Sequence, residues 1–338
     1  MADQDRRMLA AWFAEGRAGL VQRPAPVPAP GQALVRVRYC GICNTDLELL
    51  AGYHHFAGVP GHEFSGVVEQ APGRPHLVGR LVTAEINQGC GTCPRCLMGD
   101  PRHCPDRVAL GIKGWDGALA QYVLAPLANL RRVPEGVPAR AAALAEPLAA
   151  ALEVGQQLHL TAGMKALVLG DGKLGLLCAL GLRHQIPGLI LAGRHQNKLD
   201  LAVAQGVRAV LADGPDLAEL ARGLGGFDLV VEATGRPQGL GQALELVRPE
   251  GTIVAKTTSH RPSELDLARL VVNEISLVGS RCGDIGLALA YLKNGWLDVA
   301  PLIAAEYPLE DISAALDHAR RPGALKILVR VSDQGLLP

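Results

Sequence analysis

Hydrophobic residues follow two different patterns along the chain, and the change comes near residue 138. Before it, short apolar runs typical of strands are broken by glycine and proline, as in ALVRVRYC, EFSGVVEQ, GRLVTAEI and ALAQYVLAP. After it, ARAAALAEPLAAALEVGQQL predicts a helix, and from Lys165 onward apolar strands alternate with helical segments. The six strands predicted there are KALVLG, GLILAG, VRAVLA, FDLVVEA, GTIVAK and ISLVGS.

Short apolar strands joined by helical crossovers are typical of an α/β fold with a doubly wound parallel sheet. The remaining tail, IGLALAYLKNGWLDVAP followed by DISAALDHARRPGALKILVRV, predicts two helices and a strand. The chain is therefore expected to have a β-rich first part, a parallel-sheet second part and a tail of mixed structure.

Composition and charge narrow the classes of function. The 338 residues favour two domains, and 49% hydrophobic with 20% charged residues indicates a folded globular protein. Lysine plus arginine balances aspartate plus glutamate at 33 each, so no electrostatic footprint for nucleic acid or an acidic membrane surface is present. MADQDRRMLAAWF lacks the apolar run of a signal peptide, and no eighteen-residue apolar stretch occurs. We expect a cytoplasmic protein with no membrane or nucleic-acid partner.

A cluster of cysteines indicates a metal site. Residues 89–104 read GCGTCPRCLMGDPRHC, and in a reducing compartment such thiols are expected to bind metal rather than form disulfides. Four thiolates can close a tetrahedral shell around zinc, and a closed shell leaves no position for substrate, so the metal would be structural. A four-thiolate iron–sulfur cluster is the alternative. The four candidate ligands are Cys90, Cys93, Cys96 and Cys104.

A glycine-rich turn predicts a dinucleotide site. The strand KALVLG leads into GDGKLG and then a helix, which is the context that gives a GxGxxG motif its meaning. The glycines allow a tight turn, the approach of a pyrophosphate and close helix packing, and the helix N-terminus faces the phosphate charge. The residues expected to contact the cofactor are Gly170, Gly172, Lys173, Leu174 and Gly175.

The end of the second strand bears on which cofactor binds. A site for NAD places Asp or Glu there, whereas this chain has Gly193 followed by Arg194, His195 and, further on, Lys198. Glycine makes room for a 2′-phosphate and a guanidinium can bind it with two hydrogen bonds. NADP is therefore favoured, with NAD still possible if these basic residues only solvate a helix start.

Two further stretches, CGICNTD at 40–46 and GHE at 61–63, come before the cysteine cluster. With DGALAQYVLAPLANLRRVPEGV, VVEATG and LVGSRCG, they make the chain resemble the zinc-dependent medium-chain alcohol dehydrogenases, in particular the threonine and polyol branch, over nearly its whole length. The resemblance implies a GroES-like catalytic domain over 1–146 with a structural zinc lobe at 89–105. It also implies a Rossmann domain over 147–283 and a C-terminal segment, 284–338, that returns to the catalytic domain.

The resemblance also implies a second, catalytic zinc. By match to the family motifs its ligands are Cys43, His62 and Glu146, and three protein ligands leave a fourth position for water or substrate. Thr45 matches the residue that begins proton relay, Asp46 one that orients the His62 ring, and Glu63 one that lies behind the zinc. The chain departs from the family pattern after Asp46, where a histidine is often found, and Glu48, His54 or His55 are candidates to replace it.

Three more family positions concern the cofactor. Thr234 lies in VVEATG, Arg236 matches a residue that packs on the adenine, and Lys326 in ALKILV matches a basic residue near the pyrophosphate. Arg236 and Lys326 could equally be surface charges.

Together these features predict a zinc-dependent oxidoreductase with two zinc ions per chain, which moves a hydride between an alcohol, polyol or sugar and NADP(H) or NAD(H). A quinone or enoyl reductase on the same fold is one alternative, although such relatives lack the catalytic ligand set. A non-catalytic dinucleotide-binding zinc protein is the other. The substrate is expected to be a small molecule with an alcohol group, with small alcohols, polyols, sugars and 3-hydroxy amino acids all open, and the resemblance implies a homodimer or homotetramer.

Overall fold

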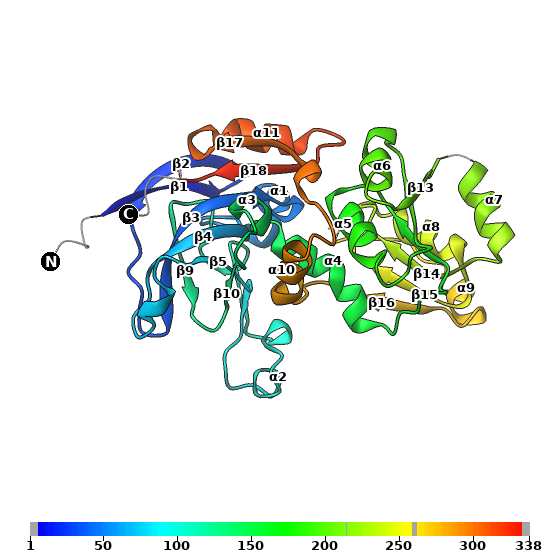
Figure 1. Ribbon diagram of the computed structural model, residues 1–338, viewed down its shortest axis with the longest axis horizontal. Coiled ribbons are helices and arrows are strands. Elements are labelled where there is room, and N and C mark those ends of the chain that lie inside the picture. Colours follow the sequence, from blue (N-terminus) through cyan, green and yellow to red (C-terminus); the bar gives the residue numbers. More distant parts are fainter. Residues whose placement is uncertain (1–5, 214, 259–261, 333–338) are drawn as a thin grey trace. The chain divides into compact units, whose positions relative to one another are not determined.

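The computed structural model describes residues 6–213, 215–258 and 262–332. The chain divides into two compact units (Figure 1): unit 1 joins residues 1–146 to 303–338, and unit 2 spans residues 147–302. The second division lies after Leu302 rather than at 284, where the sequence analysis placed it. Tyr291 and Trp296 explain this, because both rings pack against His184 of unit 2.

Unit 1 is built on a seven-stranded sheet in the order β10-β5-β4-β3-β18-β17, with β9 paired to β3. Its strands are β3 (Gln32–Ile42), β4 (Glu63–Gln70), β5 (Leu81–Ala84), β9 (Tyr122–Pro126), β10 (Leu130–Arg132), β17 (Ile303–Pro308) and β18 (Lys326–Arg330). Smaller sheets are formed by β1 (Arg7–Ala14) with β2 (Arg17–Pro24), and by β6 (Asn87–Gln88), β7 (Val108–Leu110) and β8 (Gly114–Trp115). The helices are α1 (Asn44–Leu50), α2 (Pro94–Leu97), α3 (Ala139–Ala142) and α11 (Ile312–Arg320), and α4 (Ala145–Gln157) begins where unit 1 gives way to unit 2.

The two ends of the chain meet in the unit 1 sheet. Strand β18 pairs antiparallel with β3, from Ile327 opposite Ile42 to Arg330 opposite Tyr39, and β17 runs parallel to β18. The tail therefore supplies the strand that the sequence predicted and one that it did not. Strand β17 was missed because IAAEYP lies at the sheet edge with only half-buried or exposed side chains, and its apolar pattern is weak.

Unit 2 contains a six-stranded sheet in the order β13-β12-β11-β14-β15-β16, with every neighbouring pair parallel. The strands are β11 (Ala166–Leu169), β12 (Ile190–Gly193), β13 (Arg208–Leu211), β14 (Phe227–Glu232), β15 (Val247–Ala255) and β16 (Ser276–Gly279). The helices are α5 (Lys173–Leu182), α6 (Gln196–Val203), α7 (Pro215–Leu224), α8 (Gly239–Leu246), α9 (Leu267–Val272) and α10 (Ile285–Lys293). All six predicted strands are present, and the predicted doubly wound parallel sheet is confirmed.

Helices cover both faces of this sheet. Side chains of α7, α8 and α9 join Leu167, Ile190 and Phe227 in one apolar cluster. Helices α5 and α6 contact each other and β11–β13 but contribute no residue to that cluster, so they cover the opposite face. Figure 1 shows α7–α9 across the sheet from α5. The order of strands changes direction between β11 and β14, and ligands of such sheets bind at the carboxyl ends of the strands there.

No helix in the described ranges combines the length and apolar character needed to cross a membrane.

A buried ion pair joins the tail of the chain to the centre of the unit 1 sheet. The Lys326 ammonium on β18 donates to the Glu63 carboxylate on β4 and, at 3.3 Å, to the Ile42 carbonyl on β3. The two side chains are only 3% and 1% exposed. Burial alone would lower the pKa of Lys326, but the Glu63 charge outweighs it and raises the pKa. The Lys326 side chain is therefore held in the charged form.

Replacing Lys326 by methionine should strongly destabilise unit 1, because it leaves the Glu63 charge buried without its partner. We expect a loss of about 3–5 kcal/mol in the free energy of unfolding, measured by chemical denaturation. The double variant Lys326→Met/Glu63→Gln should recover part of this loss, and the exposed-site control Lys293→Met should change little. Equal stability of Lys326→Met and the control would contradict a structural role for the pair.

Candidate metal and cofactor sites

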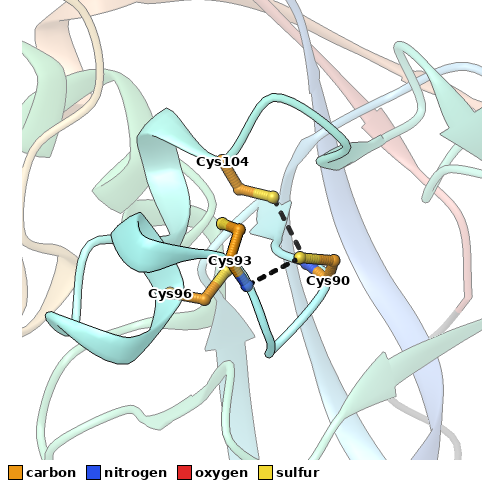
Figure 2. Close-up of side chains that lie close together, drawn as sticks. All are labelled: Cys90, Cys93, Cys96 and Cys104. Atoms are coloured by element: carbon orange, nitrogen blue, oxygen red, sulfur yellow. Dashed lines mark hydrogen bonds between the residues drawn. The ribbon is translucent and has the colours of Figure 1, made fainter.

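The four clustered cysteines come together in a lobe formed by residues 89–105. Their sulfur atoms all lie within 4.8 Å of one another. Figure 2 shows the side chains gathered between the start of α2, where Cys93 is the N-cap residue, and the segment that ends at Cys104. Backbone N–H groups of Cys93 and Cys90 donate to Cys90 Sγ and Cys104 Sγ, each at 3.4 Å. Soft sulfur donors in this arrangement fit Zn²⁺ well.

The thiols of the lobe differ in how readily they ionise. The N–H and hydroxyl of Thr92 and the N–H of Cys93 lower the pKa of Cys90 to about 6. At Cys96 a backbone donor at Gly91 lowers the pKa, but burial and the neighbouring thiols outweigh it and raise the pKa to about 12. Thiolates this close together repel one another, so all four can be ionised together only around a cation.

A second group of potential metal ligands lies elsewhere in unit 1. Ligand atoms of Cys43, His62 and Glu63 fall within 4.8 Å of one another. Cys43 follows β3 and is the N-cap residue of α1, while Glu63 begins β4 and His62 comes directly before it. Because β3 and β4 are antiparallel neighbours, the end of one strand lies beside the start of the other. The sheet thus brings Cys43 together with residues that lie nineteen and twenty positions later in the sequence.

Asp46 organises this group from a fully buried position. Its carboxylate accepts the N–H of Cys43 at 2.8 Å and the N–H of Gly61 at 3.2 Å. Its Oδ1 atom also lies 3.6 Å from His62 Nδ1, slightly longer than a hydrogen bond. Burial lowers the pKa of His62, but Asp46 and Cys43 outweigh it and raise the pKa well above its usual value.

The fit of this group to a metal follows from His62. Its Nδ1 atom is buried and has no hydrogen-bond partner among the described residues. With Nδ1 turned toward Asp46, the other ring nitrogen is the one available to a metal, and a carboxylate behind the ring is the usual arrangement at zinc sites. Thiolate, imidazole and carboxylate are all ligands that zinc accepts.

The other predicted catalytic residues lie in or near α1 and α4. The Thr45 hydroxyl is 3.7 Å from Cys43 Sγ, and Glu48 follows one turn later on α1. Glu146 lies in the first turn of α4 and is half-buried. It does not belong to the group of Cys43, His62 and Glu63 whose ligand atoms lie within 4.8 Å of one another in the described part of the chain. The structure therefore brings Glu63, rather than Glu146, next to Cys43 and His62.

A pocket of about 530 Å³ opens in unit 1. Its wall combines histidine, lysine, aspartate and aromatic side chains from two loops, residues 54–57 and 112–116. The residues directly after the second loop pair with the segment before His62, since the N–H groups of Gly117 and Ala118 donate to the carbonyls of Val59 and Gly61. His54 and His55 both adopt positive φ angles, 61° and 49°, which side-chain-bearing residues rarely do.

In unit 2 the glycine-rich turn has the geometry of a phosphate-binding loop. Gly170 has φ 118°, and a Cβ atom on Gly175 would lie 1.9 Å from the Gly170 carbonyl oxygen, so close packing requires glycine at both positions. A Cβ on Gly172, the N-cap residue of α5, would meet nothing within 4 Å. The backbone there borders open space, as needed for a pyrophosphate to approach the helix N-terminus.

A carboxylate lies at the end of β12, although the strand itself carries none there, and the preference for NADP stays a prediction. The carboxylate belongs to Asp171, between the first two glycines of the turn. Asp171 Oδ2 accepts the N–H groups of Arg194 and His195, each at 2.7 Å, and lies 2.9 Å from His195 Nδ1. Lys198 Nζ is 4.0 Å from Oδ1. Gly193, Arg194, His195 and Lys198 thus surround an acidic side chain.

The remaining cofactor candidates are placed as follows. The backbone N–H and hydroxyl of Thr234, after β14, donate to the buried Glu232 carboxylate at 2.8 and 2.7 Å. Arg236 is exposed, and its N–H donates to the Thr234 hydroxyl. Lys326 is not a surface charge, since its ammonium is bound to Glu63 within unit 1. Its predicted contact with a pyrophosphate, like the other cofactor contacts, stays a prediction.

Comparison with known proteins identifies the family. A model described as an alcohol dehydrogenase GroES-like domain matches residues 29–135, and one described as a zinc-binding dehydrogenase matches residues 174–302. A sorbitol dehydrogenase from Halalkalibacterium halodurans is 30% identical over 333 residues, covering 94% of this chain and 97% of the relative. The chain belongs to the zinc-type medium-chain alcohol dehydrogenase family.

Solved structures of this family extend the match to the whole fold. An alcohol dehydrogenase from Escherichia coli CFT073, in complex with NADH, aligns with a TM-score of 0.89 at 26% identity and covers 96% of this chain and 99% of its own. A zinc-binding dehydrogenase from Sinorhizobium meliloti 1021, bound to NADP, aligns with 0.87 at 27% identity and covers 97% and 100%. The predicted family, the combination of GroES-like and Rossmann domains, and the alcohol dehydrogenase class are confirmed. The two cofactors also show that the fold alone does not select between NAD and NADP.

Two residues of these sites were missed in the sequence. Asp171 stood inside the glycine motif, but the motif assigns no role to that position, and only the empty side-chain space of Gly193 could have suggested one. Thr257, whose hydroxyl donates to Glu232 at 2.8 Å, lies 25 residues away and carried no motif.

Disrupting the cysteine lobe should remove one metal ion and lower stability. We expect Cys93→Ser to lose about one zinc per chain by elemental analysis and to lower the melting temperature by at least about 5 °C, because a structural zinc contributes folding free energy. The buried thiol of Cys178 in unit 2 offers a matched control, and Cys178→Ser should keep its zinc. Unchanged metal content and stability in Cys93→Ser would exclude a structural metal in the lobe.

Proposed function

We propose that the protein oxidises a polyol or a related secondary alcohol, or reduces the corresponding ketone, with a catalytic zinc in unit 1 and a nicotinamide dinucleotide on unit 2. The observation that carries the proposal is that ligand atoms of Cys43 and His62 lie within 4.8 Å of one another, with carboxylates close by, in a chain that belongs to this family. In the oxidative direction the alcohol loses a hydride to nicotinamide C4 and a proton to the protein, and leaves as a carbonyl compound.

Charge favours Glu146 over Glu63 as the third zinc ligand. Cys43 thiolate and one carboxylate balance the two positive charges of the ion. Glu63 is already neutralised by Lys326, and taking it as a ligand would leave a buried ammonium without its partner beside a cation. We therefore assign the zinc to Cys43, His62 and Glu146, with Glu63 and Lys326 as a neutral pair behind it. Zinc held there would act as a Lewis acid that lowers the pKa of the alcohol hydroxyl.

The protein residues then handle the proton. Thr45 lies beside Cys43, so its hydroxyl is placed to accept the proton of the alcohol and pass it on. Glu48, one turn further along α1, is the next acceptor we assign. Asp46 does not exchange this proton. It is buried and bound to two backbone N–H groups, and its role is to hold the His62 ring in one orientation.

The pocket in unit 1 supports a polyhydroxylated substrate. His54, His55 and Lys113 line it as polar groups, and Trp115 offers an apolar surface for a carbon chain. The sorbitol dehydrogenase relative is consistent with that class. Asp116 is already engaged, by the Val59 N–H at 3.0 Å and Arg23 at 2.9 Å, and it serves to fix the loop.

Two features favour the alcohol dehydrogenase over the alternatives. A zinc-independent quinone or enoyl reductase would not need the half-buried Cys43 next to the buried His62 and Asp46. A non-catalytic binding protein would not need an open metal shell. The cysteine lobe adds a second, structural zinc, so we propose two zinc ions per chain.

Replacing Cys43 should lower both the turnover rate and the zinc content of the protein. We expect wild-type protein to turn over members of a panel of alcohols, polyols, sugars and hydroxy amino acids with NAD(H) or NADP(H), and a zinc chelator to abolish the rate. Cys43→Ser should retain about one zinc instead of two and lose about 10²-fold or more in kcat. Cys178→Ser should match wild type.

The carboxylates give the sharper comparison. Glu146→Ala should lose the catalytic zinc, whereas Glu63→Gln should keep it. The opposite result would make Glu63 the ligand. Turnover that resists the chelator would favour the reductase alternative, and dinucleotide binding without turnover of any substrate would favour the non-catalytic one.

We also propose that chains associate through the β16 edge of the unit 2 sheet. Strand β16 ends the sheet, and Leu277 on it and Val271 and Val272 on the adjoining α9 are exposed apolar residues. A strand edge with exposed apolar side chains is well suited to pairing with a second copy.

Charges placed on this edge should separate the chains. We expect wild type to sediment as a dimer or larger assembly and Leu277→Lys/Val272→Glu to sediment as a monomer. Val203→Glu, at an exposed apolar position on α6, should leave the assembly intact. A monomeric wild type would contradict the proposal.

A further inference from the structure

The carboxylate of Asp171 sits in a ring of donors at the carboxyl end of β12. Two backbone N–H groups, those of Arg194 and His195, donate to it at 2.7 Å, and the His195 ring nitrogen lies at 2.9 Å. The Lys198 ammonium, whose side chain is 6% exposed, adds a positive charge 4.0 Å away. The Asp171 side chain is itself only 10% exposed. This is a built anion site, and a side chain of the protein occupies it.

The Asp171 side chain occupies the space that a side chain at position 193 would fill if that residue were not glycine. A Cβ atom on Gly193 would lie 2.4 Å from the Asp171 Cβ and 2.7 Å from its Oδ2. Gly193 is the last residue of β12, the second strand of the nucleotide-binding sheet, where NAD sites carry an acidic residue that binds the adenosine ribose. Here the acid comes from the glycine-rich turn after β11 and reaches the same place.

The surroundings of Asp171 keep it ionised. Burial raises the pKa of its carboxyl, but the donors on His195 and Arg194 and the Lys198 charge outweigh burial and lower the pKa. A 2′-phosphate would bring nearly two further negative charges to this position. The two backbone N–H groups that it could bind already donate to Asp171, and Arg194 Nε is paired with Asp213 at 2.9 Å.

We propose that Asp171 selects NAD over NADP by accepting the hydroxyl groups of the adenosine ribose and repelling a 2′-phosphate. The proposal rests on the dinucleotide site of the proposed function, and it reverses the preference for NADP that Gly193 and Arg194 suggested in the sequence. It also assigns Arg194, His195 and Lys198 to holding Asp171 rather than to binding phosphate.

One substitution should then expose a phosphate site that already exists. Asp171→Asn removes the charge while keeping an oxygen for the two backbone N–H groups, and it releases His195 and Lys198 toward the cofactor. Asp171→Gly/Gly193→Asp moves the carboxylate from the turn to the strand, where the removed side chain has left room for it.

Isothermal titration calorimetry with NADH and NADPH tests this without reference to activity, and titration with ADP and 2′,5′-ADP isolates the adenosine half. We expect wild type to bind NADH more tightly than NADPH on the order of a hundredfold, as for like charges brought together at a binding site. Asp171→Asn should strengthen NADPH binding about tenfold or more, and Asp171→Gly/Gly193→Asp should keep the preference for NADH. Asp228→Asn, the same charge change at the amino end of β14, should leave the ratio unchanged.

Several results would overturn the proposal. Equal affinity of the wild-type protein for NADPH and NADH would contradict the proposal. This test needs no variant, so it does not depend on whether a variant folds. The proposal would also be contradicted by an Asp171→Asn protein that has a native circular dichroism spectrum and an unchanged ratio of NADH to NADPH affinity. If wild type binds neither NADH nor NADPH, the proposed function itself fails, which is distinguishable from a dinucleotide site with the wrong preference.

Discussion

Glu63 and Lys326 lie almost completely out of water, and each depends on the other to remain there. A buried charge is tolerated only when a partner and further hydrogen bonds replace the lost hydration. Lys326 has Glu63 and the Ile42 carbonyl, and Asp46 close by has two backbone N–H groups. The end of β3, the start of β4 and the start of β18 are held in register by these contacts, and that register is what places Cys43 beside His62.

The same rule shapes unit 2 with different components. Asp171 is ionised and nearly buried, and it is held by backbone N–H groups, an imidazole and an ammonium. In both units the polar groups that sequence motifs assign to a ligand are partly engaged with other residues of the chain. From the sequence, Lys326 and Lys198 were expected to bind phosphate or lie at the surface. In the structure each is buried and faces a carboxylate. A ligand must therefore be recognised by the donors and acceptors that are not already bound within these networks.

Much of the fold could be predicted because it depends on local patterns. The strand EFSGVVEQ coincides with β4, and the apolar runs between residues 165 and 280 became β11–β16. The four cysteines could be grouped because their spacing is short. Contacts between distant residues could not be predicted, since nothing in ALKILV indicates that Lys326 meets Glu63, 263 positions earlier. The place of the Asp171 carboxylate could not be predicted for another reason. It depends on the direction of the Asp171 side chain and on the absence of a side chain at Gly193.

The return of the chain to its first sheet has a consequence for the order of events during synthesis. Unit 2 is one continuous segment, so it can fold as soon as it has been made, as domains generally do. Unit 1 has to wait. Glu63 leaves the ribosome 263 residues before Lys326, which is roughly tens of seconds at usual rates of translation. During that interval the stretch of β3 from Tyr39 to Ile42 lacks its partner strand β18, and Glu63 lacks its counter-ion, so unit 1 is completed only after unit 2 has been made.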